Sequence, residues 1–193
     1  MLGRTHEVAA VGAVVSAAVL YPPANITVET AVVSLLMALI GGITPDIDKP
    51  GSKIWSNVPA GGIFSRLIHP VFIGGHRHLT HSLLGLALFG LIMRAVLSIA
   101  PLGLHIDPNL VLWSFIIALA SHLATDMLTK EGVPLLFPLP FHFGFPPFEF
   151  LRMRTNGLVE NVLITPGIVL GVCALAYSHR ESALSLLRIL GIG

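Results

Sequence analysis

The stretch PNLVLWSFIIALASHLATDML, residues 108–128, decides the fold. It is about as long as the ~20 apolar residues that a helix needs to cross the hydrocarbon core of a membrane. Its two ionisable side chains, His122 and Asp126, lie near one end, four positions apart and therefore on one face of a helix. Such a pair at the edge of a membrane is costly and predicts a functional site, the alternative being a structural His–Asp hydrogen bond.

The rest of the chain shows the same bias toward apolar residues. Of its 193 residues, 54% are hydrophobic and only 11% are charged, and the mean hydropathy is +0.84. Soluble domains carry about 25% charged residues, so this chain has too few to cover a water-facing surface. A net charge of +1 excludes a broad basic field, and we expect no direct binding of nucleic acid. The single Cys173 excludes a disulfide framework and a cysteine-rich zinc site.

The apolar residues form five segments, at residues 5–21, 29–44, 79–100, 108–128 and 158–177. We expect one integral-membrane domain over residues 1–193, an all-α, multi-pass transmembrane helical bundle of about five membrane helices. A long loop joins the second and third helices. A loop rich in Pro and Phe, PLLFPLPFHFGFPP at residues 134–147, joins the fourth and fifth and is too broken for a helix. It is predicted to be either a lid or lipid entry, or an aromatic anchor at the membrane interface.

The basic residues predict the orientation of the bundle. The short links 21–28 and 101–107 contain no Lys or Arg. The N-terminus and the two long loops, in contrast, carry Arg4, Lys49, Lys53, Arg66, Arg77, Lys130, Arg152 and Arg154. The positive-inside rule then places the N-terminus and the long loops in the cytoplasm. We expect a protein of the inner (plasma) membrane, in contact with the lipid bilayer, and the sequence does not indicate its oligomeric state.

Two carboxylates follow the second apolar segment. Pro45 ends this segment, and Asp46 and Asp48 come directly after it. A carboxylate is unfavourable at the C-terminal end of a helix, because the helix macrodipole is negative there. The pair is therefore predicted to bind a metal ion, and the alternative is a solvated helix end.

Three histidines precede the third apolar segment in GGHRHLTHS, residues 74–82. His78 and His81 share a helix face, and His76 can approach from the same side. Together with two nearby aspartates they predict a metal site to which His76 and His81 contribute, rather than a pH-sensitive polar cluster. Arg77 is predicted to bind an anionic group, because a guanidinium binds phosphate in bidentate fashion; the alternative is a positive-inside anchor.

Two further candidates stand at the starts of the first and fifth segments. His6 is the only imidazole of the first segment, and its position in the same polar layer makes it a candidate ligand. Glu160 is a candidate ligand or general base, although a Glu near a helix N-terminus also stabilises the helix dipole. The predicted metal ligands are thus His6, Asp46, Asp48, His76, His81, His122 and Asp126.

The ligand types restrict the metal. Mixed imidazole and carboxylate ligands suit a divalent transition metal, zinc above all, with manganese or iron as alternatives. The candidates exceed the four ligands of one tetrahedral zinc, so one or two ions are expected. Two ions would bind the attacking oxygen and the leaving oxygen when a phosphoester is displaced.

Four motifs in order carry a resemblance to a known family. They are Pro45-Asp46-Ile47-Asp48 with Ser52, His76-Arg77-x-x-Thr80-His81-Ser82, Ser121-His122-x-x-x-Asp126-x-x-Thr129-x-x-Gly132, and Arg154-Thr155 with Glu160. The chain resembles the YdjM-like family of multi-pass membrane proteins, described as metal-dependent hydrolases and as LexA-binding, inner-membrane-associated proteins. The resemblance implies metal residues at His6, Asp46, Asp48, His76, His81, His122, Asp126 and Glu160. One departure is Thr155-Asn156-Gly157, where the family has Thr-Gly-Ser.

These observations predict a membrane-embedded metal-dependent hydrolase. We expect a phosphoesterase that acts on a lipid or amphiphilic substrate at the cytoplasmic membrane face, through a metal-activated water, with Arg77 and Glu160 as catalytic residues. The alternative is a non-catalytic transporter or sensor that handles metal ions or protons. Transporters place their ion sites near the bilayer midplane, whereas these candidates cluster at one end. A third interpretation is a membrane scaffold that recruits a cytoplasmic partner.

Overall fold

Five long apolar helices form the body of the protein. The computed structural model describes residues 1–56, 58–68, 77–100 and 105–191. The helices are α1 (Gly3–Leu20), α2 (Val28–Ile43), α5 (Leu83–Ile99), α6 (Pro108–Asp126) and α7 (Thr165–Ser178), and a π-helical turn, η5 (Glu160–Ile164), leads into α7. Each of the five predicted segments is helical, which confirms the all-α bundle.

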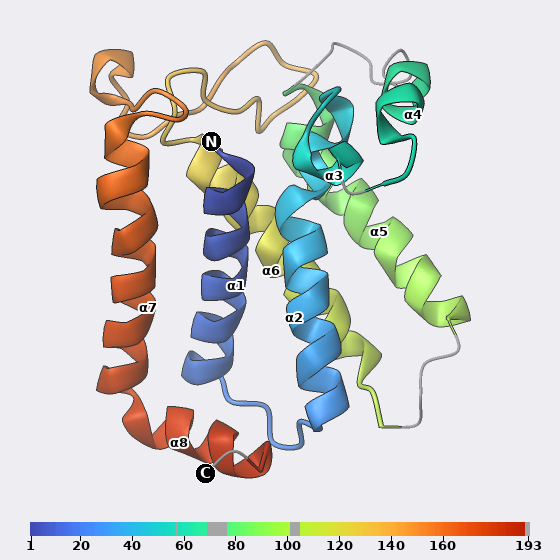
Figure 1. Cartoon of the computed structure of the whole chain (residues 1–193), viewed down its shortest axis with the longest axis vertical. Helices are drawn as coiled ribbons and strands as arrows, with labels where there is room; N and C mark the ends of the chain where they lie inside the picture. The colour runs from blue at the N-terminus through green and yellow to red at the C-terminus, as the bar shows by residue number, and fades with distance from the viewer. Residues whose placement is uncertain (57, 69–76, 101–104, 192–193) are drawn as a thin grey trace.

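The helices pack around α1, α2 and α6. In Figure 1, α1 stands between α7 and α2, and α6 crosses behind α1 and α2. α6 also contacts α5, so this helix touches three others. Small side chains fill the centre, where Ala10, Val14, Ala38 and Ala118 form one buried cluster. Phe115, Leu119 and Leu123 extend this core along α6.

Two glycines bring three helices close together at the end of α2. A Cβ atom on Gly41 would lie 2.6 Å from the carbonyl oxygen of Phe115 in α6. A Cβ atom on Gly42 would lie 2.6 Å from the Cβ of Ala10 in α1. Since real Cβ atoms do not approach other atoms so closely, glycine is required here for α1, α2 and α6 to meet. This close contact lies directly beside the polar cluster described below.

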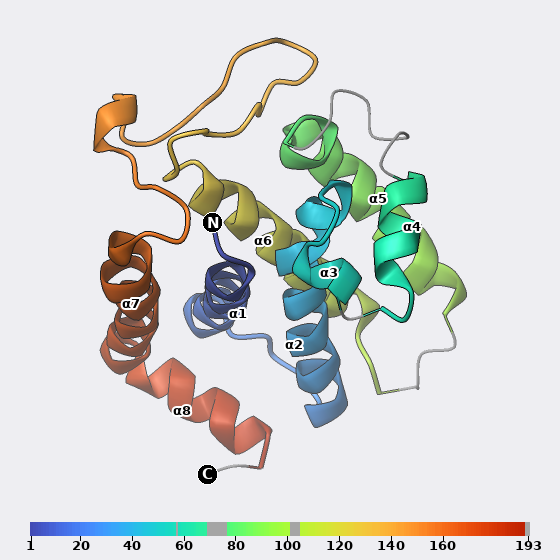
Figure 2. The same ribbon diagram turned by 45° about the horizontal axis from the view of Figure 1, so that its top comes forward.

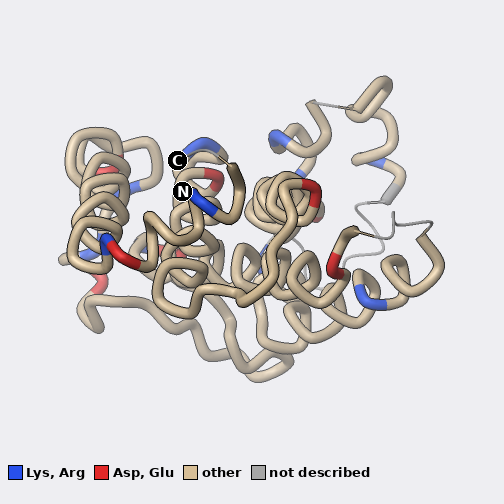
Figure 3. Tube along the Cα trace, turned by 90° about the horizontal axis from the view of Figure 1, so that it is seen from below, with Lys and Arg blue, Asp and Glu red and all other residues tan. Residues whose placement is uncertain are grey.

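The bundle carries membrane-spanning helices. In the described part of the chain, three helical stretches are long and apolar enough to cross a membrane, namely Val28–Asp48, Pro108–Asp126 and Glu160–Ser178. The apolar helix Leu83–Ile99 is shorter. Charged residues are sparse along the trace, as Figure 3 shows. Large apolar side chains such as Leu91, Leu163 and Leu170 are exposed on the outside of the bundle, where lipid would contact them.

The two ends of the bundle differ. One end carries η1 (Thr44–Asp48), α3 (Lys53–Ser56), α4 (Gly61–Ile68), η3 (Leu79–His81) and the segment 127–159 with η4 (Glu149–Leu151). Figure 2 turns this end forward and shows the N-terminus beside the end of α6. The opposite end carries the short link between α1 and α2, and α8 (Arg180–Ile189), which lies across the bottom of the bundle in Figure 1.

The loop rich in Pro and Phe is irregular, as predicted, but it has a defined path. Val133 and Phe143 exchange two backbone hydrogen bonds of 2.8 Å. The Arg152 side chain donates to the carbonyl oxygens of Pro146 at 2.8 Å and Pro147 at 3.0 Å. These bonds satisfy backbone groups that a helix would otherwise pair. Several aromatic side chains of this region remain exposed, including Phe141, Phe145, Phe148 and Phe150.

Candidate metal centre

His122 lies at the centre of the polar cluster. The last turns of α6 carry it into the region where Gly41 and Gly42 let α2 approach, and its side chain is fully buried. Its Nδ1 lies 2.7 Å from the carbonyl oxygen of Gly42. A carbonyl can only accept a hydrogen bond, so Nδ1 carries the proton and the neutral ring presents a lone pair at Nε2. This Nε2 lies 3.3 Å from Nε2 of His81.

Hydrogen bonds also place the proton of His81 on Nδ1. The Thr80 hydroxyl donates its hydrogen to the Asp48 carboxylate. The Thr80 oxygen therefore accepts the hydrogen bond from His81 Nδ1, which lies 2.9 Å away. His81 also turns its Nε2 toward His122, with the two rings in an edge contact at a centroid distance of 5.2 Å.

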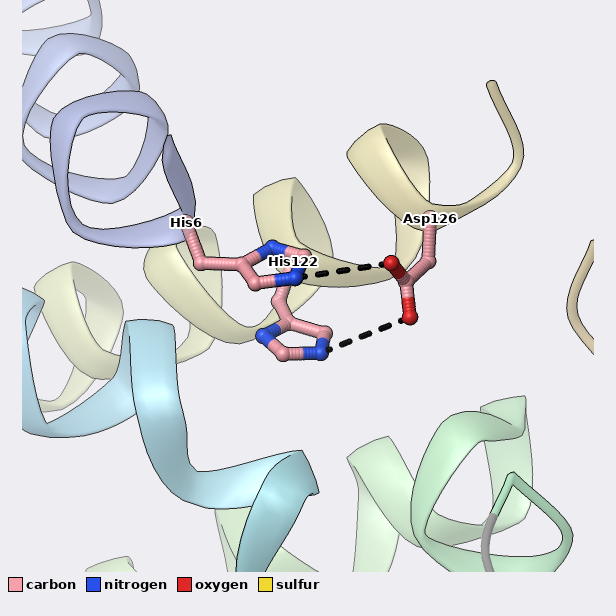
Figure 4. Close-up of side chains that lie close together, drawn as sticks. All are labelled: His6, His122 and Asp126. Atoms are coloured by element: carbon pink, nitrogen blue, oxygen red, sulfur yellow. Dashed lines mark ion pairs between the residues drawn. The ribbon is translucent and has the colours of Figure 1, made fainter. Parts of the chain in front are cut away.

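His6 completes the set of imidazoles. The Thr125 hydroxyl donates to the His122 carbonyl at 2.9 Å, so its oxygen accepts from His6 Nδ1, also at 2.9 Å. The buried Nε2 of His6 then has a lone pair and no hydrogen-bond partner among the described residues. Figure 4 shows the His6 ring stacked on His122, with a centroid distance of 3.6 Å and an interplanar angle of 13°.

Two carboxylates face these nitrogens. Asp126 Oδ1 lies 3.4 Å from His6 Nε2, and Asp126 Oδ2 lies 3.5 Å from His81 Nε2 and 3.8 Å from His122 Nε2. Asp46 Oδ1 lies 3.8 Å from His81 Nε2 and 4.0 Å from His122 Nε2. Ligand atoms held at about 2.0–2.1 Å around a tetrahedral ion are separated by about 3.3 Å, so the spacings are close to those that one ion requires.

The ligand atoms fall into two groups that could each hold a metal ion. One group is His6, His122 and Asp126, and the other is Asp46, His81 and His122. Acceptor nitrogens and carboxylates meet in both, and burying such groups against one another is unfavourable unless a cation lies between them. In each imidazole the Nδ1 is bound to the protein, which is the usual arrangement in histidines that bind metal through Nε2. The residues therefore fit a divalent ion.

Two cationic groups contact the same oxygens of Asp126 that face the imidazoles. The amino group of Met1 lies 2.6 Å from Oδ1, and the Arg77 guanidinium lies 3.1 Å from Oδ2. Arg77 also donates to Thr129 at 3.1 Å and pairs with Glu131 at 3.3 Å. Partial burial would raise the pKa of Glu131, but its own backbone amide and Arg77 hold that pKa below its ordinary value. The predicted binding of a substrate anion by Arg77 stays a prediction.

Asp48 and Glu160 lie outside the two groups. The Asp48 carboxylate accepts from the backbone amide of Arg77 at 3.1 Å and from Thr80, behind His81. The two oxygens of Glu160 accept from the backbone amides of Leu2 and Asn156, both at 2.7 Å. These contacts favour a positioning role for each residue. Asp48 as a ligand and Glu160 as a general base stay predictions.

Three histidines, of which only His76 is a predicted ligand, cannot be placed in this cluster. His76 lies outside the described residues. His105 lies at the opposite end of the bundle, where its carbonyl oxygen accepts from Thr27 and Thr30, and His179 lies between α7 and α8. The structure thus brings together four of the predicted segments, through His6, Asp46, His81, and the pair His122 and Asp126.

Sequence reasoning missed the hydroxyls that orient the histidines and the pocket that adjoins them. Thr80 directly precedes His81 and was an available signal, whereas Thr125 accepts from His6, 119 residues away in sequence, and no local pattern predicts that contact. The pocket has a volume of about 420 Å³ and is lined by Met1, Asp46, Lys49, Arg77, Glu131, His142 and Thr155. His142 comes from the loop rich in Pro and Phe, whose path no periodicity predicts.

The fold and this cluster define a class: multi-pass α-helical membrane proteins with a buried cluster of histidine and aspartate side chains, which could bind a metal ion, at one end of the bundle. Comparison with known proteins identifies the family. The model of the family described as YdjM inner membrane protein matches residues 1–190, and the chain belongs to this family. The resemblance seen in its motifs is thereby confirmed, and the family is one of inner membrane proteins.

Two relatives illustrate the match. The chain is 32% identical to the uncharacterized protein YvsG of Bacillus subtilis over 177 residues, which cover 92% of this chain and 95% of YvsG. It is 36% identical to the inner membrane protein YdjM of Escherichia coli over 114 residues, which cover 56% of this chain and 51% of that protein. No solved structure matches the chain.

Proposed function

We propose that the protein is a membrane-embedded metal-dependent hydrolase, a phosphoesterase that acts on a lipid or amphiphilic substrate. One observation carries this proposal: three buried imidazoles, each with Nδ1 bound to the protein, turn Nε2 toward one another and toward two carboxylates. Such convergence of acceptors is stable around a divalent cation and costly without one. Membership of the YdjM family is compatible with this activity.

Five residues would hold one or two ions. His6 and Asp126 belong to one position, Asp46 and His81 to the other, and His122 lies between them. Mixed nitrogen and oxygen ligands favour zinc, with manganese or iron as alternatives. An ion bound there supplies Lewis acidity and lowers the pKa of a coordinated water toward neutrality.

The other side chains bind and orient the reacting groups. Arg77 holds the Asp126 carboxylate through its contact of 3.1 Å with Oδ2, and we propose that it also reaches the anionic group of a substrate in the adjoining pocket. Asp46 is the most open of the candidate ligands, with a side chain 15% exposed, whereas the side chains of His6, His81, His122 and Asp126 are at most 1% exposed. Because Asp46 also lines the pocket, the pocket is the side from which a substrate reaches the ions.

The position of the cluster relative to the membrane is an argument for an amphiphilic substrate. The cluster lies at the ends of α2 and α6, which are long and apolar enough to span a membrane. Exposed aromatic side chains such as Phe141 and Phe145 surround the same end and suit the membrane interface. We propose that this end and the N-terminus face the cytoplasm, as the basic loops predict. A substrate with its head group in the pocket and its chain in the bilayer fits this placement.

A transporter or sensor is the alternative, favoured by the same buried ligands. Metal analysis and an activity screen separate the two. We expect purified protein prepared without chelator to hold about one or two transition-metal ions per chain, and to release phosphate or alcohol from phosphoesters in a panel of lipid and soluble substrates.

The variants His122→Ala and Asp46→Ala should lose both metal and turnover. His105→Ala is the matched control, because His105 lies at the other end and its hydrogen bonds described above use its backbone carbonyl. Wild-type protein without metal would overturn the metal site. Bound metal with no hydrolysis of any ester would replace the enzyme by the transporter or sensor.

A further inference from the structure

Three unpaired donors line the pocket beside the candidate metal centre. They are the Lys49 ammonium group, the His142 imidazole and the Thr155 hydroxyl, and all three residues are exposed. None of the three side chains has a hydrogen bond or ion pair within the described part of the chain. Lys53, by comparison, pairs with Glu7. The pocket therefore contains donors that the fold itself does not use.

The backbone at or next to each of the three donor residues is hydrogen-bonded. Lys49 directly follows η1, and its amide donates to the Asp46 carbonyl at 3.1 Å. His142 precedes Phe143, which exchanges two hydrogen bonds of 2.8 Å with Val133. Thr155 follows Met153, whose amide donates to Leu128 at 3.1 Å. Three separate segments with hydrogen-bonded backbones thus present donors to one space of about 420 Å³.

The acidic side chains that line the pocket have cationic or imidazole neighbours, whereas the cation Lys49 has no acidic one among the described residues. Glu131 is compensated by Arg77 at 3.3 Å, and Asp46 faces the candidate metal ligands His81 and His122. Lys49 remains as a cation without an anionic partner among the described residues. A lysine, an imidazole and a hydroxyl from three separate segments match the several oxygens of a phosphate group.

From this arrangement we propose that the pocket binds a second phosphate group of the substrate, next to the phosphoester held at the metal centre. The inference rests on the proposed function and narrows it: the substrate is an amphiphile that carries a diphosphate or two neighbouring phosphates. Lys49, His142 and Thr155 are binding residues for the second phosphate, whereas the metal ligands hold the first.

Binding of non-hydrolysable analogues tests this subsite. Full-length protein in detergent, loaded with zinc, is titrated by calorimetry with dodecylphosphonate and with a dodecyl chain that ends in methylenediphosphonate. We expect the diphosphonate to bind the wild type at least about tenfold more tightly. Lys49→Met and His142→Phe should each remove most of this preference. Lys130→Met should keep it, because Lys130 belongs to the same face but does not line the pocket.

The variants also separate chelation from recognition. A diphosphonate can bind metal ions better by itself, so a preference that stays unchanged in Lys49→Met and His142→Phe would overturn the subsite, as would equal binding of the two analogues by the wild type. Methylenediphosphonate without the alkyl chain is the third ligand, and binding as tight as that of the alkylated form would overturn the amphiphilic substrate.

Failure of the subsite is distinguishable from failure of the proposed function. If the wild type holds metal and hydrolyses phosphoesters while its preference among the analogues is absent or independent of Lys49, only the subsite is wrong. If the wild type holds no metal, the proposed function is wrong. Metal content of Lys49→Met and His142→Phe equal to that of the wild type shows that the variants are folded, because the ligands come from distant segments.

Discussion

Two candidate membrane spans, α6 and the stretch formed by η5 and α7, are alike in length and hydropathy but differ in how deeply they are buried in the bundle. Pro108–Asp126 and Glu160–Ser178 have the same length of 19 residues and mean hydropathies of 1.4 and 1.7. In the first, 44% of the apolar window is buried inside the bundle, and in the second none of it is. Each has an acidic residue at the end that carries the long loops, yet Asp126 faces three imidazoles while Glu160 accepts from two backbone amides. Hydropathy therefore predicts a span, but the partners of its terminal polar residue decide whether that residue belongs to a site.

The largest effect is expected from a substitution that removes the central histidine of the cluster at the end of α6. His122 belongs to both candidate ligand groups, so His122→Ala should weaken metal binding by at least about a hundredfold, more than the loss of an orienting partner causes. Metal titration of protein stripped with chelator measures the effect, with His105→Ala as the control. Retention of wild-type metal affinity would mean that His122 is not a ligand and that the polar end of α6 does not form a metal site.

Glu160 gives the corresponding test on the side of α7. Glu160→Gln replaces one acceptor of a backbone amide by a donor, and we expect a loss of about 3 kcal/mol in the free energy of unfolding with metal content unchanged. Thermal unfolding in detergent measures it, and Glu149→Gln is the control because Glu149 is exposed. Loss of metal at unchanged stability would make Glu160 a ligand, and loss of turnover alone would support its prediction as a general base.

The difference in burial between the two helices predicts a smaller effect on packing. Leu119 in α6 is fully buried, whereas Leu170 in α7 is 68% exposed. We expect Leu119→Ala to cost about 2 kcal/mol, at the lower end for buried leucines, because lipid is as apolar as the protein interior. Leu170→Ala should cost less than about 0.5 kcal/mol. Equal effects in a detergent unfolding assay would show that α7 packs as tightly as α6.

The smallest effect comes from a residue that orients a ligand. Thr125→Val removes the acceptor of His6 Nδ1 without altering the ligand itself. We expect about tenfold weaker metal binding and a fold unchanged by circular dichroism. Thr27→Val at the opposite end is the matched control, since the Thr27 side chain bonds only to Thr30 and to the backbone of His105 in the described structure. A metal affinity equal to that of the wild type would remove His6 from the ligand set.

The sequence was sufficient for the helices and for the end at which the polar residues meet. Apolar segments joined by short and long links place His6, Asp46, His81 and His122 at one end of the bundle whatever the packing is. The sequence was not sufficient to separate the candidate ligands from the residues that lie beside them. Asp46 and Asp48 are two positions apart, and only the 3₁₀ turn of η1 decides that Asp46 faces the cluster while Asp48 binds Thr80 and the amide of Arg77.

The pocket depends even more on tertiary structure. His142 approaches Lys49 and Thr155 only because the loop around it is held by backbone bonds and by Arg152. Irregular segments have no periodicity from which such a path could be predicted, and their hydrogen bonds form between residues far apart in sequence.

Gly42 gives the bundle a further property. Its missing side chain lets α1 approach α2, and its carbonyl oxygen fixes the ring of His122 in α6. A chain that has inserted all of its spans into the bilayer, but has not yet docked α2 against α6, lacks an oriented His122. The candidate metal centre therefore forms when the bundle assembles and not at membrane insertion, and on the proposed function metal retention would report on the maturation of the protein within the bilayer.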